Sequence, residues 1–153
     1  MSNRRRELFD THSVEETEAV GRALAASLRA GDVVALSGGL GAGKTAFVRG
    51  VAAALAPEAH VSSPTFALVH RYEGSPALYH FDLYRLSDED ELVDIGFFDY
   101  LREQAILLIE WSELAPTLMP EQRVTVTLEP LVPGGNDRRI IIEWGGPHAD
   151  SGY

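Results

Sequence analysis

The sequence predicts an α/β fold, a three-layer P-loop-type sandwich with a mixed, mainly parallel sheet and a C-terminal antiparallel hairpin. Two short, uninterrupted apolar runs, 33–36 and 105–109, are typical of strands buried on both faces. A glycine-rich loop and a helical pattern follow the first run, and two strand-like segments flank a Pro-Gly-Gly-Asn turn near the C-terminus. With 153 residues, of which 45% are hydrophobic, the chain can fill one core, so we expect a single domain over 1–153.

The first helix is expected from Ser13 to about Arg29. Ser13, with Glu16 three residues later, forms the pattern of a capping box. One face of this helix is apolar and carries Val20, Leu24 and Leu28. An Ala-rich stretch within it suits close packing against a sheet.

The strand and helix around the glycine-rich loop come next. Gly31-Asp32 turns the chain into the buried strand Val33–Leu36. A helix is then expected from Lys44 to about Leu55, where it ends before Pro57. The glycine-rich loop therefore joins the end of a strand to the start of a helix.

The middle of the chain changes to shorter, strand-like pieces. Thr65–Tyr72 and Leu78–Tyr84 flank a Glu-Gly-Ser-Pro turn and indicate an antiparallel hairpin. An acidic run from Ser87 to Glu91 indicates a helix start, because carboxylates stabilise the positive end of the helix dipole. We interpret that charge run as a solvated helix start rather than a site.

The remaining strands are expected in the last third of the chain, and the first of them ends in an acid. Ala105–Glu110 is expected to be a second doubly buried strand, and Val124–Leu128 with Arg139–Trp144 a closing hairpin. The ends of the chain, 1–10 and 146–153, are expected to be frayed tails.

The glycine-rich loop is the strongest functional signal. It reads Gly-Gly-Leu-Gly-Ala-Gly-Lys-Thr and fits the P-loop pattern G-x-x-x-x-G-K-[ST] in full, with a strand before it and a helix beginning inside it. Glycines let backbone N–H groups approach phosphate oxygens, and the helix start and the lysine supply positive charge. The expected nucleotide contacts are Gly38, Gly39, Leu40, Gly41, Ala42, Gly43, Lys44, Thr45 and Ala46. Lys44 is the only lysine in the chain.

Two carboxylates are candidates to complete this site. Glu110, at the end of its apolar strand, lies where an acid could share a magnesium ion with the hydroxyl of Thr45. Asp82 lies two residues after His80, so both are expected on the same, polar face of their strand. Asp82 could position a water there. Each residue type is also common at an ordinary strand end or strand surface. Trp111 could lie against a nucleotide base or pack in the core.

Composition excludes several other classes of function. A formal net charge of −10 has the wrong sign for gripping nucleic acid directly, so any nucleic-acid role should run through a partner. The absence of cysteine removes thiolate chemistry, and the five histidines show no metal-ligand spacing. No apolar run approaches the roughly 20 residues of a membrane helix, so we expect no membrane association and a cytoplasmic protein.

In this order, the motifs resemble those of one family. The P-loop, Ser63-Pro64-Thr65-Phe66, His80-Phe81-Asp82-Leu83-Tyr84-Arg85 and Ile109-Glu110-Trp111 together resemble the TsaE family, the bacterial tRNA threonylcarbamoyladenosine biosynthesis ATPase. The resemblance runs from about Thr11 to Trp144. One departure is visible, because Gly39 stands where the family usually carries aspartate.

The resemblance implies a set of roles. Thr45 and Glu110 would hold Mg²⁺, Trp111 would contact the adenine side of ATP, and Asp82 would be needed for hydrolysis. Thr65 would lie in a switch-like loop near the γ-phosphate. The family acts with TsaB and TsaD, and its ATP hydrolysis would reset that assembly between turnovers. tRNA would be met only through the complex, and DNA not at all.

Two other readings remain open on the residues alone. A free-standing small-molecule kinase shares the P-loop but needs an acceptor pocket and usually an arginine-bearing lid. Arg71 and Arg85 leave this open, but the short chain has little room for a lid domain. A non-catalytic switch would use ATP to order the loop around Ser62 to Phe66. A GTPase is disfavoured, because its guanine-reading motif needs a second lysine.

Overall fold

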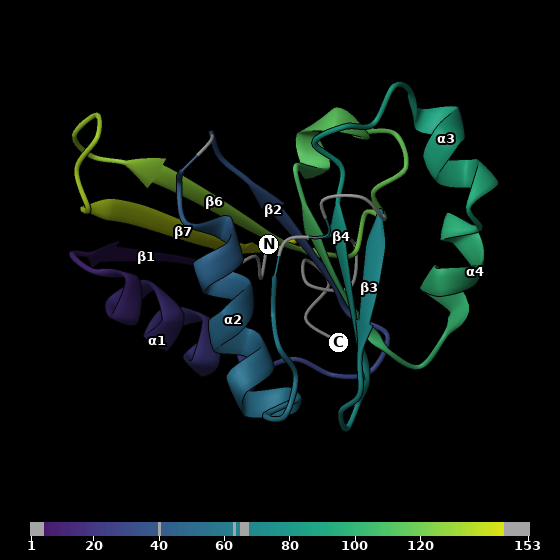
Figure 1. The fold of residues 1–153 in the computed structure, drawn as a ribbon, viewed down its shortest axis with the longest axis horizontal. Helices are drawn as coiled ribbons and strands as arrows, with labels where there is room; N and C mark the ends of the chain where they lie inside the picture. The colour runs from purple at the N-terminus through teal and green to yellow at the C-terminus, as the bar shows by residue number, and fades with distance from the viewer. Residues whose placement is uncertain (1–4, 40, 63, 65–67, 146–153) are drawn as a thin grey trace.

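A computed structural model of the chain describes residues 5–39, 41–62, 64 and 68–145. Seven strands form one sheet in the order β1-β7-β6-β2-β5-β4-β3. The strands are β1 Arg5–Thr11, β2 Val33–Ser37, β3 Val69–Tyr72, β4 Leu78–Asp82, β5 Ile106–Glu110, β6 Val124–Pro130 and β7 Arg138–Trp144. The helices are α1 Val14–Ala25, α2 Lys44–Leu55, α3 Glu89–Asp94, α4 Phe97–Arg102 and a 3₁₀ turn, η1, at Ser112–Leu114. Figure 1 shows their arrangement.

The sheet is mixed, as predicted, with its parallel pairing in the middle. β2 pairs in parallel with β5 on one side and β6 on the other, and β5 continues in parallel to β4. The outer pairs, β1 with β7, β6 with β7 and β3 with β4, are antiparallel. The closing hairpin of the prediction is β6 and β7, and the middle hairpin is β3 and β4. Residues 65–67 of the predicted middle hairpin lie outside the described residues.

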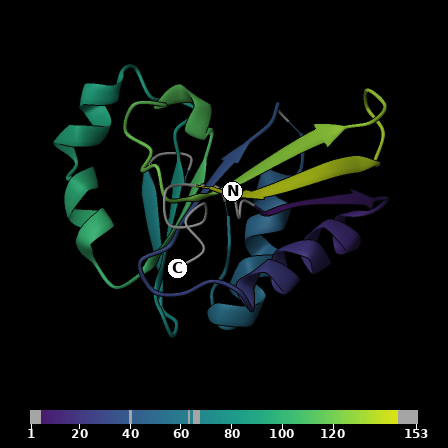
Figure 2. The ribbon, with the colours of Figure 1, turned by 180° about the vertical axis from the view of Figure 1, so that it is seen from behind.

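The three layers follow from alternation along the central strands. Val34 and Leu36 of β2 pack in one core with Phe47 and Val51 of α2, whereas Val33 packs in a second core on the opposite face. That second core also contains Leu92 of α3 and Phe97 of α4. The strands predicted to be doubly buried therefore have helices on both faces, with α1 and α2 side by side on one and α3 and α4 on the other (Figures 1 and 2).

The N-terminal segment corrects one expectation. Residues 1–10 were predicted to be a frayed tail, but Arg5–Thr11 forms β1, an edge strand paired antiparallel with β7 from Arg5↔Trp144 to Thr11↔Arg138. The physical reason is that β7 offers a free row of backbone donors and acceptors, which the local sequence cannot reveal. Phe9 also packs against the core. Residues 1–4 and the predicted tail 146–153 lie outside the described residues.

The helix starts follow the predicted capping chemistry. Ser13 caps α1 by accepting a hydrogen bond from the Glu16 amide at 3.1 Å, while the Glu16 carboxylate accepts from the backbone N–H of His12 at 2.8 Å. α1 ends at Ala25, before the predicted Arg29. The acidic run predicted to start a helix does so, and α3 has Asp88 as its N-cap.

Helices α1 and α2 cross at very short range. A Cβ built on Gly50 of α2 would lie 1.9 Å from the backbone oxygen of Glu18, and one on Gly21 of α1 would lie 2.3 Å from that of Phe47. Only glycine fits at both positions, so the two helices lock together and fix α2, whose first turn ends the P-loop.

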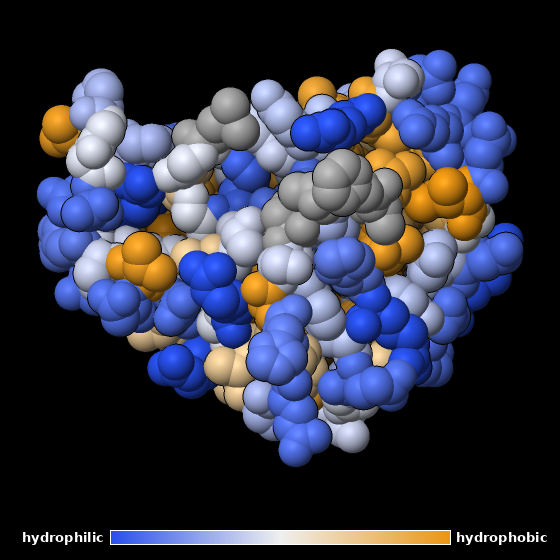
Figure 3. Space-filling view, in the orientation of Figure 1, coloured by the Kyte–Doolittle hydropathy of each residue, from blue (hydrophilic) through white to orange (hydrophobic). Residues whose placement is uncertain are grey.

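The surface is mainly hydrophilic in the view of Figure 3, with apolar residues more frequent toward the end that carries α3 and α4. Val93, Ile95 and Phe98 are exposed apolar residues of that end. Within the described ranges, no helix is both long enough and apolar enough to span a bilayer.

Candidate nucleotide site

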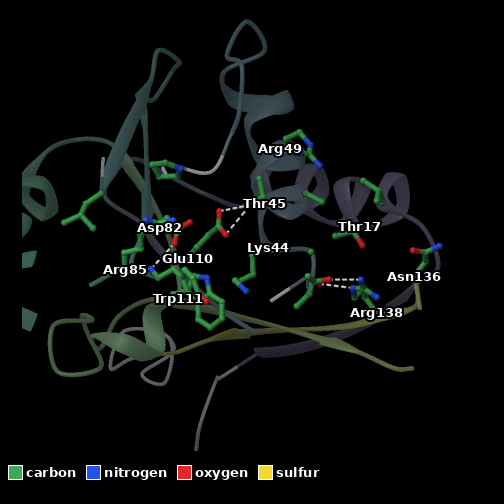
Figure 4. Close-up of a pocket in the computed structure, with 18 of the residues that line it drawn as sticks. Thr17, Lys44, Thr45, Arg49, Asp82, Arg85, Glu110, Trp111, Asn136 and Arg138 are labelled. Atoms are coloured by element: carbon green, nitrogen blue, oxygen red, sulfur yellow. Dashed lines mark hydrogen bonds between the residues drawn. The ribbon is translucent and has the colours of Figure 1, made fainter. Parts of the chain in front are cut away.

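The site is a cavity at the carboxyl edge of the central strands. It has a volume of about 660 Å³ and runs along the P-loop between two groups of side chains. One end is lined by Asp82, Tyr84, Arg85, Glu110 and Trp111, and the other by Ser13, Val14, Thr17, Asn136 and Arg138 (Figure 4). In an open α/β sheet, ligands bind at this edge, where the strands' carboxyl ends meet the following loops.

The P-loop backbone has the conformation that its glycines were predicted to permit. Gly38, Gly41 and Gly43 have positive φ values of 146°, 74° and 101°. Gly38 is also closely packed, since a Cβ there would lie 2.5 Å from the backbone oxygen of Leu128. α2 begins directly after Gly43, so its first amides, including those of Thr45 and Ala46, lack helical partners and can bind an anion. Leu40 lies outside the described residues.

Lys44 lies at the centre of the site. Its side chain is almost buried, at 5% exposure, and Nζ donates to the carbonyl oxygens of Gly38 at 2.5 Å and Gly39 at 2.9 Å. Burial lowers the pKa of Lys44, and the nearby carboxylates of Glu110, Glu113 and Asp82 oppose that shift. A desolvated ammonium whose hydrogen bonds go to neutral carbonyl oxygens can exchange them for phosphate oxygens.

Thr45 and Glu110 meet as the sequence predicted. The Thr45 hydroxyl lies 3.2 Å from Oε1 and 3.1 Å from Oε2 of Glu110, close enough to donate to this carboxylate. Glu110 is the last residue of β5 and only 2% exposed, so its carboxylate faces the first turn of α2 rather than solvent (Figure 4). Glu110 is thus a buried acid rather than a solvated strand-end acid.

These two residues suit a magnesium ion. Mg²⁺ in nucleotide sites usually takes one or two protein oxygens and completes its octahedron with waters and phosphate oxygens. Among the described residues, no group of three or more histidine, aspartate or glutamate side chains converges as a self-sufficient metal centre would require. The donor set of one carboxylate and one hydroxyl beside an anion cradle therefore fits Mg²⁺ brought with a nucleotide.

Asp82 ends the neighbouring strand at the same edge. In the register of β4 with β5, Asp82 is the partner of Glu110, so the two acids lie on adjacent positions of neighbouring strands. Oδ1 of Asp82 accepts a hydrogen bond from the backbone N–H of Tyr84 at 3.0 Å, and the residue lines the cavity. The predicted alternation of β4 is confirmed, but His80 on the polar face is fully buried rather than on a strand surface.

Trp111 follows Glu110 in an unusual conformation. Its φ is 59°, the only positive value at a non-glycine residue in the described ranges. The indole ring lies under the Lys44 ammonium, with Nζ 4.1 Å from the ring centroid, and against Tyr84 at 4.9 Å between centroids. Trp111 is thus part of the cavity wall rather than only core, and it lies beside the cation of the site.

Two charged residues that contact the P-loop backbone were not predicted from the sequence. Arg138, at the start of β7, donates from Nε to the carbonyl of Ala42 at 3.1 Å and from Nη2 to that of Gly41 at 2.7 Å (Figure 4). Glu113 of η1 accepts a hydrogen bond from the Gly38 amide at 3.4 Å. Neither belongs to a motif, and only the position of a charged residue beside a predicted hairpin turn could have pointed to Arg138. Thr65 lies outside the described residues.

Comparisons with known proteins agree on one family. Residues 11–141 match the family described as "Threonylcarbamoyl adenosine biosynthesis protein TsaE". The Bacillus subtilis tRNA threonylcarbamoyladenosine biosynthesis protein TsaE is 39% identical over 132 residues, covering 86% of this chain and 80% of that protein. The protein of the same name from Treponema pallidum is 37% identical over 127 residues, covering 83% of this chain and 94% of that one.

A solved crystal structure is similar to this fold over most of the chain. The crystal structure of Bacillus subtilis YdiB superposes with a TM-score of 0.76 and 30% sequence identity, covering 94% of this chain and 88% of that chain. The sequence match spans the P-loop, both acids and Trp111. This chain therefore belongs to the TsaE family.

Proposed function

We propose that this chain is a Mg²⁺-dependent ATPase that serves tRNA threonylcarbamoyladenosine biosynthesis as an accessory subunit acting with TsaB and TsaD. ATP hydrolysis would reset that assembly between turnovers. The observation that carries the proposal is the pairing of Thr45 with the buried Glu110 next to an anion cradle that already holds the Lys44 ammonium.

Each residue has a distinct role in this proposal. The amides from Gly38 to Ala46 bind phosphate oxygens, and Lys44 neutralises the β and γ phosphates. Thr45 and Glu110 hold Mg²⁺, which supplies positive charge to the phosphate oxygens when bound. Asp82, at the same sheet edge, orients the attacking water.

The place of the adenine is a further part of the proposal. The Lys44–Trp111 contact of 4.1 Å puts the indole beside the phosphate-binding cation. This contact supports a role for Trp111 at the phosphate end of the cavity more than the adenine contact implied by the family resemblance. The opposite end, lined by Val14, Thr17 and Asn136, is then free for the base and ribose.

The partners follow from family and charge. The relatives' names place those proteins in tRNA threonylcarbamoyladenosine biosynthesis. A net charge of −10 disfavours direct tRNA or DNA binding by this chain, so tRNA is met through the complex. Action on tRNA together with such partners also implies a cytoplasmic location.

Steady-state ATP hydrolysis tests the proposal. The purified chain is assayed alone and after mixing with the TsaB and TsaD pair, with Mg²⁺ present or chelated and with Lys44→Ala as the blank. We expect slow turnover alone and a strong increase with the pair, both dependent on Mg²⁺. A rate indifferent to the pair but raised by a small hydroxylated acceptor would instead indicate a kinase. Tight ATP binding without turnover under all conditions would indicate a non-catalytic switch.

A further inference from the structure

A series of buried hydrogen bonds runs from Glu110 of the site into the interior of the protein. Nε2 of His80 lies 2.6 Å from Oε2 of Glu110, and Nδ1 of His80 lies 2.9 Å from the hydroxyl of Tyr72. The Tyr72 hydroxyl has a second hydrogen-bond partner in the backbone oxygen of Ser62, at 3.2 Å. These hydrogen bonds thus connect, in series, four residues from four different segments of the polypeptide: Glu110, His80, Tyr72 and Ser62.

Burial protects these hydrogen bonds from water and holds the His80 ring in one orientation. His80 is 0% exposed, Glu110 is 2% exposed and Tyr72 is 7% exposed, so water does not compete for these bonds. In the described part of the chain, every buried polar side-chain atom has a partner. Both nitrogens of the His80 ring are therefore committed, one to each neighbour, and the ring cannot rotate without losing one of them.

The arrangement fixes which carboxylate oxygen faces which partner. Oε2 of Glu110 accepts from the His80 ring N–H and lies 3.1 Å from the Thr45 hydroxyl, while Oε1 lies 3.2 Å from that hydroxyl. A carboxylate without the His80 contact could rotate about its last side-chain bond. The histidine therefore sets the direction in which Glu110 presents its oxygens to the first turn of α2.

The far end of this hydrogen-bond series, at Ser62, lies next to a segment that lines the cavity. Ser62 is two residues before Pro64, which is buried and lines the cavity. A displacement of Ser62 would act on the Tyr72 hydroxyl and through it on the His80 ring. The hydrogen bonds thus connect this loop with the carboxylate proposed to hold the metal.

We propose that His80 is a positioning residue for Glu110, oriented in turn by Tyr72, and that its contact through Nε2 determines how well Mg²⁺ is held with the nucleotide. This inference rests on the proposed Mg²⁺–ATP function. His80 does not touch the reacting atoms and acts only through the carboxylate. Neither the P-loop motif nor the pair of acids assigns it such a role.

Two substitutions at His80 separate the two contacts. The amide nitrogen of glutamine can occupy the place of Nε2, so His80→Gln keeps the bond to Glu110 and loses the one to Tyr72. Asparagine reaches only the place of Nδ1, so His80→Asn keeps the bond to Tyr72 and loses the one to Glu110. Tyr72→Phe removes the hydroxyl and leaves His80 in place.

The measurement is binding of a fluorescent, slowly hydrolysed ATP analogue, titrated with Mg²⁺ from zero in chelator upward. For His80→Asn we expect the Mg²⁺ concentration at half-effect to rise by about 10- to 100-fold, the usual loss when a second-layer partner of a metal ligand is removed. His80→Gln should stay close to wild type, and Tyr72→Phe should fall between them. Affinity without Mg²⁺ should be unchanged in all three, because Lys44 and the P-loop are untouched.

Other outcomes overturn the inference. Equal losses in His80→Gln and His80→Asn, accompanied by weaker binding without Mg²⁺, would show that the histidine is only a structural part of the core. A normal Mg²⁺ response in His80→Asn would show that Glu110 needs no positioning. A wild-type chain that binds the analogue equally well with and without Mg²⁺ would overturn the proposed function itself, and this inference with it.

Discussion

The Thr45 hydroxyl and the Glu110 carboxylate lie 3.1 Å apart, although 65 positions separate them in the chain. Thr45 is the second residue of α2, and Glu110 is the last residue of β5, a strand paired directly with β2. Because β2 leads into the P-loop and β5 runs parallel to it, both strands end at the same edge. The pair is therefore a consequence of strand direction and order, and under the proposed function it predicts how Mg²⁺-dependent nucleotide binding responds to substitution.

Thr45→Val tests the hydroxyl with almost no change in shape. We expect the Mg²⁺ concentration needed for tight nucleotide binding to rise by at least about tenfold, because one of two protein oxygens is lost. Affinity without Mg²⁺ should change little. Thr45→Ser, which keeps the hydroxyl, is the matched control and should behave like wild type. Titration of nucleotide binding with Mg²⁺ measures both, and equal responses of the two variants would contradict a metal role for Thr45.

Lys44→Arg tests whether charge alone is sufficient. The buried pocket under the loop carbonyls and over the Trp111 ring accommodates a compact ammonium, and a planar guanidinium cannot make the same contacts. ATP affinity should fall by roughly tenfold or more, since a hydrogen bond to a charged group contributes about 1.5–3 kcal/mol. Equilibrium binding measures the loss. The exposed Arg102→Lys should have no effect, and unchanged affinity in Lys44→Arg would refute the argument.

Gly50→Ala tests the crossing of α1 and α2. The added Cβ would lie 1.9 Å from the backbone oxygen of Glu18, which cannot move without shifting α1. We expect the free energy of unfolding to fall by about 1–3 kcal/mol, the usual cost of overpacking. Gly145→Ala is the control, because its nearest atom would be 3.9 Å away. Urea denaturation followed by circular dichroism compares them, and equal midpoints would show that the helices can separate at no cost.

The contact of His12 with Asp137 predicts a pH dependence of stability. His12 Nδ1 lies 3.0 Å from Oδ1 of Asp137. This hydrogen bond and the negative charge of Asp137 raise the pKa of His12 above its usual value of 6.5. A raised pKa in the folded state contributes stability that is fully present below the unfolded pKa and is lost as pH rises through the folded one. His12→Gln should therefore be less stable than wild type at pH 6 and equal to it at pH 9, as urea unfolding at both pH values would reveal. A deficit that is the same at both pH values would point to packing instead.

Gly39→Asp restores the residue that the family usually carries. A Cβ at this position meets nothing within 4 Å, and the backbone does not have a positive φ, so the fold should tolerate the change without loss of stability. The added carboxylate lies in the loop beside the Lys44 ammonium, and an extra oxygen near the metal should lower the Mg²⁺ concentration needed for nucleotide binding. Gly39→Asn separates charge from size. No difference between wild type and both variants would show that the departure at Gly39 is neutral.

The sequence by itself determined the parts of this protein that depend on local pattern. The positive φ values of Gly38, Gly41 and Gly43 and the start of α2 at Lys44 follow from the P-loop spacing, because helix amides and permissive glycines are local properties. The doubly buried strands that end near Ser37 and Glu110 follow from uninterrupted apolar runs. Parallel strands joined through helices then imply that their carboxyl ends share one edge, which predicted the Thr45–Glu110 pair.

Only the tertiary structure decided what depends on distant partners. Residues 5–11 form a strand because β7 presents an unpaired edge, and no pattern within three consecutive arginines indicates this. Arg138 becomes a P-loop contact because β7 begins beside the loop carbonyls of Gly41 and Ala42. His80 could be assigned to a polar face from alternation, but whether that face meets solvent or the buried Glu110 depends on which helix covers it. That burial is set by packing, which depends on contacts from distant parts of the chain. Burial makes the strand histidine a hydrogen-bond partner of Glu110, the acid proposed to hold Mg²⁺.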